Sequence, residues 1–172
     1  EPQGEITIGI TGKYTSVRDS YASLLMALEH AGAAMRVRVN HKWIDVTEVE
    51  DGNVAAALAE VDGIIVPGGF GSRGTEGKIA CIRYAREKTM PYLGLCYGFQ
   101  MAVIEFARNV VGLKGANSTE IDQSASHPVI CILPEQRKIS GVGGNMRLGG
   151  HDVQIIPQTL AARLLGNSGS YR

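Results

Sequence analysis

The sequence lacks several of the features that mark membrane, secreted or nucleic-acid-binding proteins. Its 17 basic and 17 acidic residues cancel, and no run of like charge appears, which argues against a nucleic-acid footprint or a membrane-surface patch. No apolar stretch approaches the roughly 20 residues that span a bilayer, and the N-terminus has no basic segment followed by an apolar one. Internal repeats and low-complexity linkers are also missing. We therefore expect a cytoplasmic globular protein that binds neither nucleic acid nor membrane.

Cysteine is scarce as well. The three cysteines, Cys81, Cys96 and Cys131, form no C-x-x-C pair. Their odd number and their spacing argue against a disulfide framework, and we predict no metal site. Cys81 sits on an amphipathic helix and Cys131 in a strand-like apolar run, so we expect both to be core residues. Cys96 alone occupies a strained turn.

What the sequence does contain is an alternation of apolar strands and amphipathic helices. Its 172 residues, 44% of them hydrophobic, suffice for one domain with a real core. The expected strands cover residues 5–10, 35–40, 63–66, 92–95 and 129–133. The expected helices cover about 21–31 with Gly32 as C-cap, 53–60 with Asn53 as N-cap, 75–88, 98–110 and a short segment near Leu160. This order predicts an α/β fold with a doubly wound, mostly parallel sheet and helices on both faces.

The segment 91–101 places Cys96 where a short apolar strand gives way to a helix. The pattern Gly94-x-Cys96-x-Gly98 is the thiol form of a nucleophile elbow, because the turn is too tight for a Cβ on either side. A thiol at a helix N-terminus meets the positive end of the helix dipole, which favours the thiolate. The N–H of Tyr97 is then free to face a developing oxyanion. On its own, the pattern leaves a buried structural cysteine as an equal alternative.

The glycine loop at residues 67–74 allows two interpretations. Residues 69–74 match G-x-G-x-x-G between a strand and a helix, which is the context of a dinucleotide site. Such a site needs an acidic residue about 20 residues further on, at the end of the next strand. In this sequence the next strand ends in Cys96 and not in an acidic residue, so the requirement is not met. We therefore favour a loop in which Gly68 and Gly69 turn N–H groups toward the same pocket as the cysteine and supply a second oxyanion donor.

These two segments resemble the oxyanion loop and elbow of the class I glutamine amidotransferases. Further segments resemble the amidotransferase domain of the CTP synthases in particular: Ile8, 12–14, 105–109, 116–120, 127–128, 133–135 and 143–149. The resemblance runs over nearly all of the chain. Because Ala116-Asn-Ser-Thr-Glu120 and Met146-Arg-Leu-Gly149 are rare outside this family, they disfavour another class I enzyme such as GMP synthase.

The resemblance implies a role for several residues by position. Cys96 would attack the side-chain amide of glutamine, form a γ-glutamyl thioester and release ammonia. Gly69 and Tyr97 would supply the oxyanion N–H groups. The residues that would contact the substrate are Gly68, Gly69, Gln100 and Glu120. Gln100 and Glu120 would hold its α-amino and carboxylate ends, and a carboxylate such as that of Glu120 is what an ammonium group needs.

The resemblance also implies partners beyond this domain. The ammonia would travel to a synthetase domain of the same protein, which uses ATP and Mg²⁺ to aminate UTP and is activated by GTP. Phe70 and Arg73 lie in the loop that would meet this effector. We expect no cofactor in the domain itself, and a homo-oligomer for the full-length enzyme.

Two features depart from the family pattern. The family usually carries leucine and methionine where this chain has Tyr97 and Phe99, so the bulkier rings would narrow the pocket mouth or alter docking. The family takes its catalytic histidine and glutamate from a His-Pro-x-Glu segment well after the Met-Arg-Leu-Gly stretch, and this sequence has no such segment. We do not expect any of its own histidines to replace that base: His30, His41, His127 and His151.

We therefore expect the chain to be a fragment that lacks the N-terminal synthetase domain and the C-terminal segment with the catalytic histidine and glutamate. A non-catalytic module for docking or regulation is the alternative from another functional class. The presence of Cys96, Gln100 and Glu120 together disfavours a non-catalytic module, because an inactive pocket has no physical need for all three.

Overall fold

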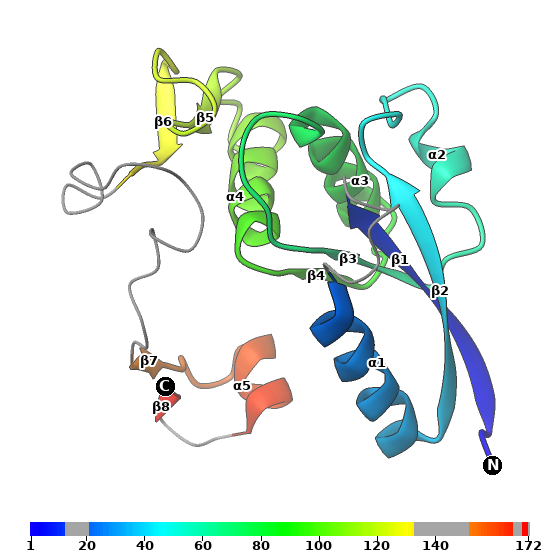
Figure 1. Cartoon of the computed structure of the whole chain (residues 1–172). Helices are drawn as coiled ribbons and strands as arrows, with labels where there is room; N and C mark the ends of the chain where they lie inside the picture. The colour runs from blue at the N-terminus through cyan, green and yellow to red at the C-terminus, as the bar shows by residue number, and fades with distance from the viewer. Residues whose placement is uncertain (13–20, 133–151, 167–169, 172) are drawn as a thin grey trace. The chain divides into compact units, whose positions relative to one another are not determined.

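The computed structural model describes residues 1–12, 21–132 and 152–166, together with the backbone of residues 170 and 171. The chain divides into two compact units, Glu1–Leu133 and Pro134–Arg172, and each is considered by itself. Figure 1 shows the course of the chain through both units. None of the helices in the described ranges combines the length and the apolar character that a membrane crossing requires.

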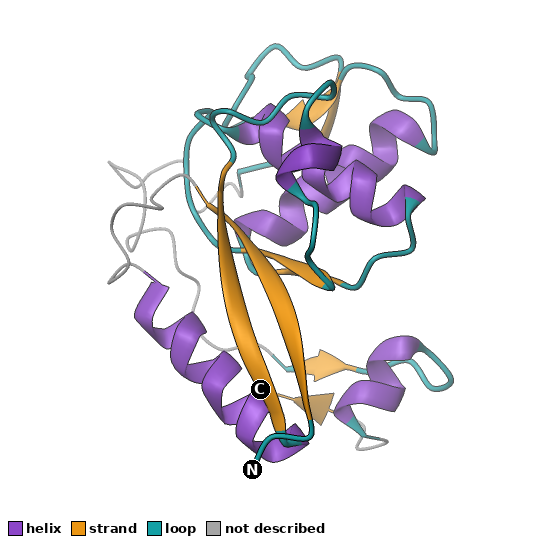
Figure 2. Cartoon of the chain, turned by 90° about the vertical axis from the view of Figure 1, so that its right-hand side faces the viewer, coloured by secondary structure: helices purple, strands orange, loops and turns teal. Residues whose placement is uncertain are grey.

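The first unit is built on a four-stranded parallel sheet in the order β2-β1-β3-β4. Its strands are β1 (Gly4–Gly12), β2 (Val37–Asp45), β3 (Gly63–Val66) and β4 (Tyr92–Gly94). Figure 2 shows β1 and β2 as two long strands lying side by side. β3 is buried at every residue, as expected of a central strand in a parallel sheet that is covered on both faces.

Helices cover both faces of this sheet. They are α1 (Ala22–Met35), α2 (Val54–Ala57), α3 (Thr75–Glu87) and α4 (Tyr97–Asn109). The step from β1 to β2 runs toward one edge of the sheet and the step from β3 to β4 toward the other. Right-handed crossovers then place α1 and α3 on opposite faces, and Figure 1 shows α1 across the sheet from α3 and α4. The predicted doubly wound α/β fold is confirmed.

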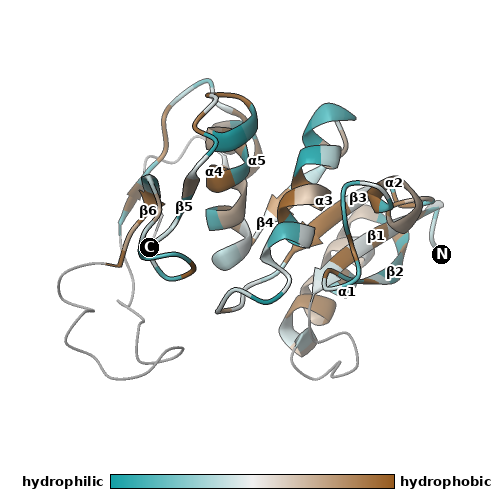
Figure 3. Cartoon of the chain, turned by 90° about the horizontal axis from the view of Figure 1, so that it is seen from above, coloured by the Kyte–Doolittle hydropathy of each residue, from teal (hydrophilic) through white to brown (hydrophobic). Residues whose placement is uncertain are grey.

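The core lies between β3 and the pair of helices α3 and α4. Figure 3 shows β3 as an apolar strand beside α3. Its main buried side chains are Ile64, Val66, Ile79, Ile82, Met101 and Ile104. α3 exposes charged residues on its other side, whereas α4 exposes Phe99 and Phe106. Both helices carry an arginine in the last turn, where a cation interacts favourably with the helix dipole. This packing places the starts of α3 and α4 at the same edge of the sheet.

Smaller elements complete the two units. In the first unit, β5 (Ala116–Ser118) pairs in parallel with β6 (His127–Ile130). In the second unit, β7 (Val153–Gln154) pairs antiparallel with β8 (Ser170–Tyr171). The same unit holds the short helix α5 (Leu160–Leu165), as expected near Leu160. The hydroxyl of Thr159 caps α5 by accepting a hydrogen bond from the Ala162 N–H at 3.2 Å.

Of the two predicted helix caps, Gly32 is wrong and Asn53 is right in position only. Gly32 lies inside α1, and the helix ends instead at Arg36 in a left-handed conformation, with φ 54° and ψ 41°. A Cβ on Gly32 would lie 2.7 Å from the Val37 carbonyl oxygen, so this glycine permits close packing of α1 against β2. Asn53 precedes α2 but makes no side-chain bond to the helix. Its amide group bonds backwards instead, to the N–H of Glu50 and the carbonyl of Glu48.

Candidate active site

The junction between β4 and α4 forms a strained elbow at Cys96. The residue has φ 52° and ψ −108° and is the N-cap of α4. A positive φ in a non-glycine residue costs on the order of 1–3 kcal/mol and persists only where the surroundings enforce it. Here two backbone bonds of 2.9 Å do so, from the Leu95 N–H to the Val66 carbonyl and from the Gly98 N–H to the Leu95 carbonyl. The predicted elbow is confirmed.

The glycines on either side of the elbow are required by space. A Cβ on Gly98 would overlap the carbonyl of Val66, and one on Gly94 would lie 2.8 Å from the backbone nitrogen of Phe99. Strand β3 and the first turn of α4 therefore approach each other as closely as their backbones allow. This approach sets the position of Cys96 relative to the sheet.

The three cysteines differ sharply in their surroundings. Cys81 is fully buried in α3, and burial raises the pKa of its thiol to about 12, so it is an inert core residue as predicted. Cys131 is exposed, so its predicted place in the core is wrong. Strand β6 ends at Ile130, and the apolar run after it does not continue into the sheet. Cys96 is exposed at the N-terminus of α4, where the first N–H groups of a helix have no intrahelical acceptor.

The glycine loop lies directly beside the elbow. β3 and β4 pair in parallel with Val66 opposite Gly94, so the chain leaves both strands at the same edge of the sheet. A Cβ on Gly68 would lie 3.7 Å from the Cβ of Cys96. The sequence-based expectation that the loop and the cysteine are neighbours is confirmed. Because the strand end that a dinucleotide site reserves for an acidic residue is the elbow itself, the dinucleotide interpretation has no structural support.

Glu120 joins this site from a distant part of the chain. It follows β5, and its carboxylate Oε1 accepts a hydrogen bond from the Gly71 N–H at 2.9 Å. Gln100 lies in the first turn of α4, half-buried, and its N–H donates to the Cys96 carbonyl at 3.2 Å. The elbow, the glycine loop and the Glu120 carboxylate therefore converge, although they come from three separate segments.

Tyr97 is buried, with 2% of its surface exposed. Its hydroxyl donates a 2.6 Å hydrogen bond to the Gly71 carbonyl and lies 3.2 Å from the Thr75 hydroxyl. The expectation that this ring narrows the pocket mouth is therefore wrong, because the side chain points inward beneath the glycine loop. The ring of Phe99 is 62% exposed.

Lys78 is a part of the site that sequence reasoning missed. It is 2% exposed, its Nζ donates to the Pro67 carbonyl at 3.4 Å, and the ammonium lies 5.1 Å from the centre of the Tyr97 ring. A Cβ on Gly69 would lie 3.7 Å from the same nitrogen. The signal in the sequence is that Lys78 stands at position i of an apolar stripe formed by Cys81, Ile82 and Ala85 at i+3, i+4 and i+7, the face that α3 buries.

Phe70 and Arg73 lie on the outer part of the loop. Phe70 is 41% exposed, and Arg73 is exposed. Hydrogen bonds from Thr47 lower the pKa of Asp45, and the positive charge of Arg73 makes a smaller contribution in the same direction. Arg73 therefore lies within electrostatic reach of the end of β2. Its proposed contact with an effector stays a prediction.

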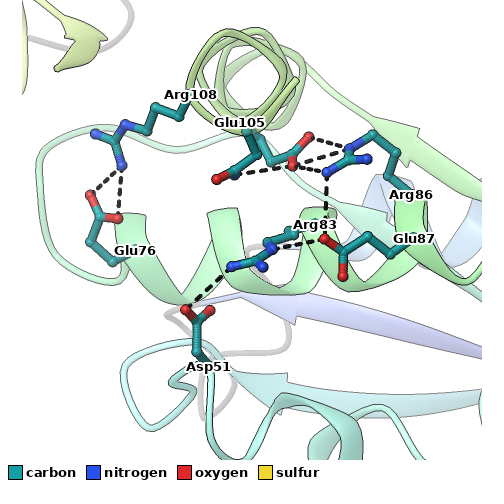
Figure 4. A network of polar contacts seen from close by, with 8 residues as sticks. Asp51, Glu76, Arg83, Arg86, Glu87, Glu105 and Arg108 are labelled. Carbon is teal, nitrogen blue, oxygen red and sulfur yellow. Dashed lines mark hydrogen bonds and ion pairs between the residues drawn. The ribbon is translucent and has the colours of Figure 1, made fainter. Parts of the chain in front are cut away.

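A network of ion pairs holds the two helices of the site together (Figure 4). The buried Glu105 carboxylate on α4 accepts from Arg86 on α3, with Nη2 to Oε1 at 2.8 Å and Nε to Oε2 at 3.0 Å. Arg108 of α4 bonds Glu76 at the start of α3 at 2.9 Å and the Ala116 carbonyl at 2.7 Å. These contacts fix α4, and with it the elbow, against α3 and the β5 segment.

The described residues do not supply a base for the thiol. His30 lies in α1, His41 in β2 and His127 in β6, and no hydrogen bond found within the described ranges links any of them to Cys96. His151 and the 143–149 segment lie outside the described residues. In the same ranges, no three histidine, cysteine, aspartate or glutamate side chains gather into a metal-binding group.

Comparison with known proteins agrees with this geometry. Residues 16–164 match the family model described as glutamine amidotransferase class-I. Curated CTP synthases from Thermus thermophilus and Thermococcus gammatolerans are 54% and 55% identical over 165 and 162 residues, covering 96% and 94% of this chain. The chain spans only 30% of the length of either protein.

A solved structure agrees with this family match. The glutaminase domain of Trypanosoma brucei CTPS with bound acivicin superposes with a TM-score of 0.85 and 38% identity, over 96% of this chain and 64% of that chain. A family model that spans most of the sequence and a close structural match point to one assignment. The chain belongs to the class I glutamine amidotransferase family.

Proposed function

We propose that this chain is the glutamine-hydrolysing domain of a CTP synthase. The observation that carries the proposal is the exposed Cys96 thiol on a positive-φ elbow, with the glycine loop beside it. The CTP synthases that match over nearly all of this chain support the choice within the family. Because the chain spans 30% of their length, glutamine hydrolysis would be one part of a longer protein's reaction.

Cys96 is the nucleophile in this proposal. Its thiolate attacks the carboxamide carbon of glutamine, and the carbonyl oxygen becomes an oxyanion that the N–H groups of Gly69 and Tyr97 receive. When the carbon–nitrogen bond breaks, the amide nitrogen takes up a proton and leaves as ammonia. Water then hydrolyses the γ-glutamyl thioester to glutamate and restores the thiol. The support is the position of Cys96 at the start of α4, next to Gly68.

In this proposal Gln100 and Glu120 bind the α-amino and α-carboxylate groups of the substrate. Gly68 and Gly69 lie along the glutamine side chain. Glu120 is suited to an ammonium group because its carboxylate already lies at the loop, where it accepts the Gly71 N–H. A carboxylate has about four lone-pair sites, so it can accept from the loop and from the substrate together. Gln100 lies one helical turn beyond the nucleophile on the same helix.

The proton shuttle and the acceptor of ammonia lie elsewhere in the full-length protein. We assign the shuttle to a histidine and a glutamate in a segment that follows this chain. The synthetase domain would precede it and would use ATP and Mg²⁺ to aminate UTP, so no residue here is assigned to either. GTP would act at the exposed Phe70 and Arg73, and the whole enzyme would be a homo-oligomer. Three free cysteines, two of them exposed, suit the reducing cytoplasm.

Cys96→Ala in the full-length protein tests the assignment. We expect CTP formation from glutamine to fall below detection while formation from added ammonia is retained, because only the ammonia supply requires the thiol. Cys131→Ala removes another exposed thiol and should leave both activities intact. Loss of both activities in Cys96→Ala would contradict a separate amidotransferase role.

A covalent label gives an independent answer. After exposure of the full-length protein to an electrophilic glutamine analogue, we expect peptide mapping to find one adduct on Cys96. Cys131 is the internal control for mere exposure, and Cys81 the control for a buried thiol. An unlabelled Cys96 in a folded protein would favour the non-catalytic docking module instead.

A further inference from the structure

The peptide unit around Gly71 is held by side chains from two different elements. Its N–H donates to Glu120 at 2.9 Å, and its carbonyl accepts from the Tyr97 hydroxyl at 2.6 Å. Gly71 itself adopts φ 74°, a left-handed conformation that costs a glycine little. Two residues before it is Gly69, the candidate oxyanion donor. The position of that donor therefore depends on bonds made at Gly71.

The other end of the loop is held as well. The ammonium of Lys78 donates to the Pro67 carbonyl and lies over the ring of Tyr97. Tyr97 thus contacts the loop directly through its hydroxyl and indirectly through the lysine that its ring supports. Its backbone N–H belongs to the first residue of α4 after Cys96. One residue therefore combines the elbow's oxyanion donor with a tether to the loop that carries the other donor.

The Tyr97 hydroxyl remains a hydrogen-bond donor across the neutral and mildly alkaline range. Burial, with smaller contributions from the Glu120 and Glu76 carboxylates, raises the pKa of Tyr97, and its contact with Thr75 offsets only part of this shift. The leucine that the resembled family usually has at this position has no donor. The tether is thus a property of this chain that the family pattern does not supply.

We propose that Tyr97 is a positioning residue, whose hydroxyl bond to the Gly71 carbonyl holds the glycine loop in register with Cys96. The inference rests on the proposed glutamine hydrolysis at Cys96. The bond links α4 to the loop before α3, so it fixes the distance between the two oxyanion donors, Gly69 and Tyr97. The bond acts on the step in which negative charge develops on the substrate oxygen, and it leaves the intrinsic reactivity of the thiol unchanged.

Tyr97→Phe in the full-length protein removes only the hydroxyl. We expect kcat for glutamine hydrolysis to fall about 5- to 10-fold, the scale of one hydrogen bond, with KM for glutamine within a factor of about two. The rate of inactivation by iodoacetamide should be unchanged, because alkylation needs the thiolate and no oxyanion donor. Tyr97→Leu also removes the ring beside the Lys78 ammonium, so it should lower kcat at least as much as Tyr97→Phe does. Tyr84→Phe, at a half-buried tyrosine of α3 away from the loop, should leave all three quantities unchanged.

Three results would overturn the inference: an unchanged kcat, a change confined to KM, or a parallel loss of kcat and of iodoacetamide reactivity. The last would mean that the hydroxyl supports the elbow or the fold. Thermal melting of each variant shows whether the loss comes from unfolding. Cys96→Ala separates the two hypotheses. If that variant still hydrolyses glutamine, the proposed function fails, whereas a normal Tyr97→Phe beside an inactive Cys96→Ala rejects the tether alone.

Discussion

The site has two strand-to-helix junctions that start side by side and are held in different ways. The elbow between β4 and α4 contains two residues and is fixed by backbone bonds to its neighbours in the sheet and the helix. The loop between β3 and α3 contains eight residues, 67–74, and is fixed by the side chains of Lys78, Tyr97 and Glu120. The nucleophile therefore stands on the more rigid junction, and the oxyanion loop depends on contacts that can be altered one at a time.

The largest effect should come from breaking the elbow. Gly98→Ala places a methyl group against the Val66 carbonyl, so α4 must shift away from β3. We expect stability to fall by about 1–3 kcal/mol, and glutamine hydrolysis to fall roughly 100-fold because the thiol moves out of position. Kinetics and denaturant melts check both numbers.

Gly52→Ala is the matched control for the elbow variant. A Cβ there meets nothing within 4 Å, so stability and activity should both be retained. A fully active Gly98→Ala would show that the elbow tolerates displacement, and the contrast between the two junctions would be lost.

The next largest effect concerns the contact that aligns the two junctions. Glu105 is 1% exposed and bonds Arg86 across α3 and α4. Glu105→Ala removes the buried partner of Arg86, whose own side chain is partly exposed, and opens a gap between the helices, so we expect the free energy of unfolding to fall by about 2 kcal/mol. Glu87→Ala removes an exposed partner of the same arginine and of Arg83, and it should have no measurable effect in the same urea melts. Equal melting midpoints for the two variants would show that burial of the pair does not matter.

The buried Cys81 and the exposed Cys131 should differ in their effect on how stability changes with pH. The pKa of Cys81 is raised from 9.0 to about 12 by burial, so the folded state keeps its proton when the unfolded state loses it. The resulting stability is complete below pH 9 and declines as pH rises from 9 toward 12. At pH 10 the decline amounts to roughly 1 kcal/mol.

Urea melts at pH 8 and pH 10 measure this decline. The difference between the two pH values should shrink by that amount in Cys81→Ala, and it should be unaltered in Cys131→Ala, which removes an exposed thiol. The same slope in wild type and Cys81→Ala would exclude Cys81 as its source.

The smallest effect should be a change in the mobility of the glycine loop, residues 67–74, with the elbow unaffected. Lys78→Met keeps the length and the apolar stem but removes the bond to the Pro67 carbonyl. We expect amide hydrogen exchange to rise about 5-fold in residues 68–71 and to stay constant in residues 97–101. Ile79→Val, a conservative change at the next position, should leave the loop amides at their original rates. Equal acceleration in both segments would mean that the junctions are coupled.

Much of the fold could be predicted because it depends on local patterns. The apolar run 63–66 coincides with β3, and the alternation of strands and helices was enough for a doubly wound sheet. Helix ends were less predictable: α1 runs past Gly32 because that glycine serves packing against β2. The prediction that Cys131 is a core residue was wrong for a similar reason, because the burial of an apolar run depends on the elements around it.

The sequence by itself determined where the elbow lies, because the strand, the Gly94-x-Cys96-x-Gly98 pattern and the helix follow one another in a single segment, whereas the carbonyl of Val66 that Gly98 must clear comes from β3. Tertiary structure alone decided how the glycine loop is held. Glu120 lies 49 residues from Gly71 along the chain and Tyr97 lies 26 residues from it, and no local pattern records such separations. The roles of the buried Lys78 and the inward-facing Tyr97 depend on the helices packed around them, because the bonds they make form only once α3, α4 and the β5 segment have come together.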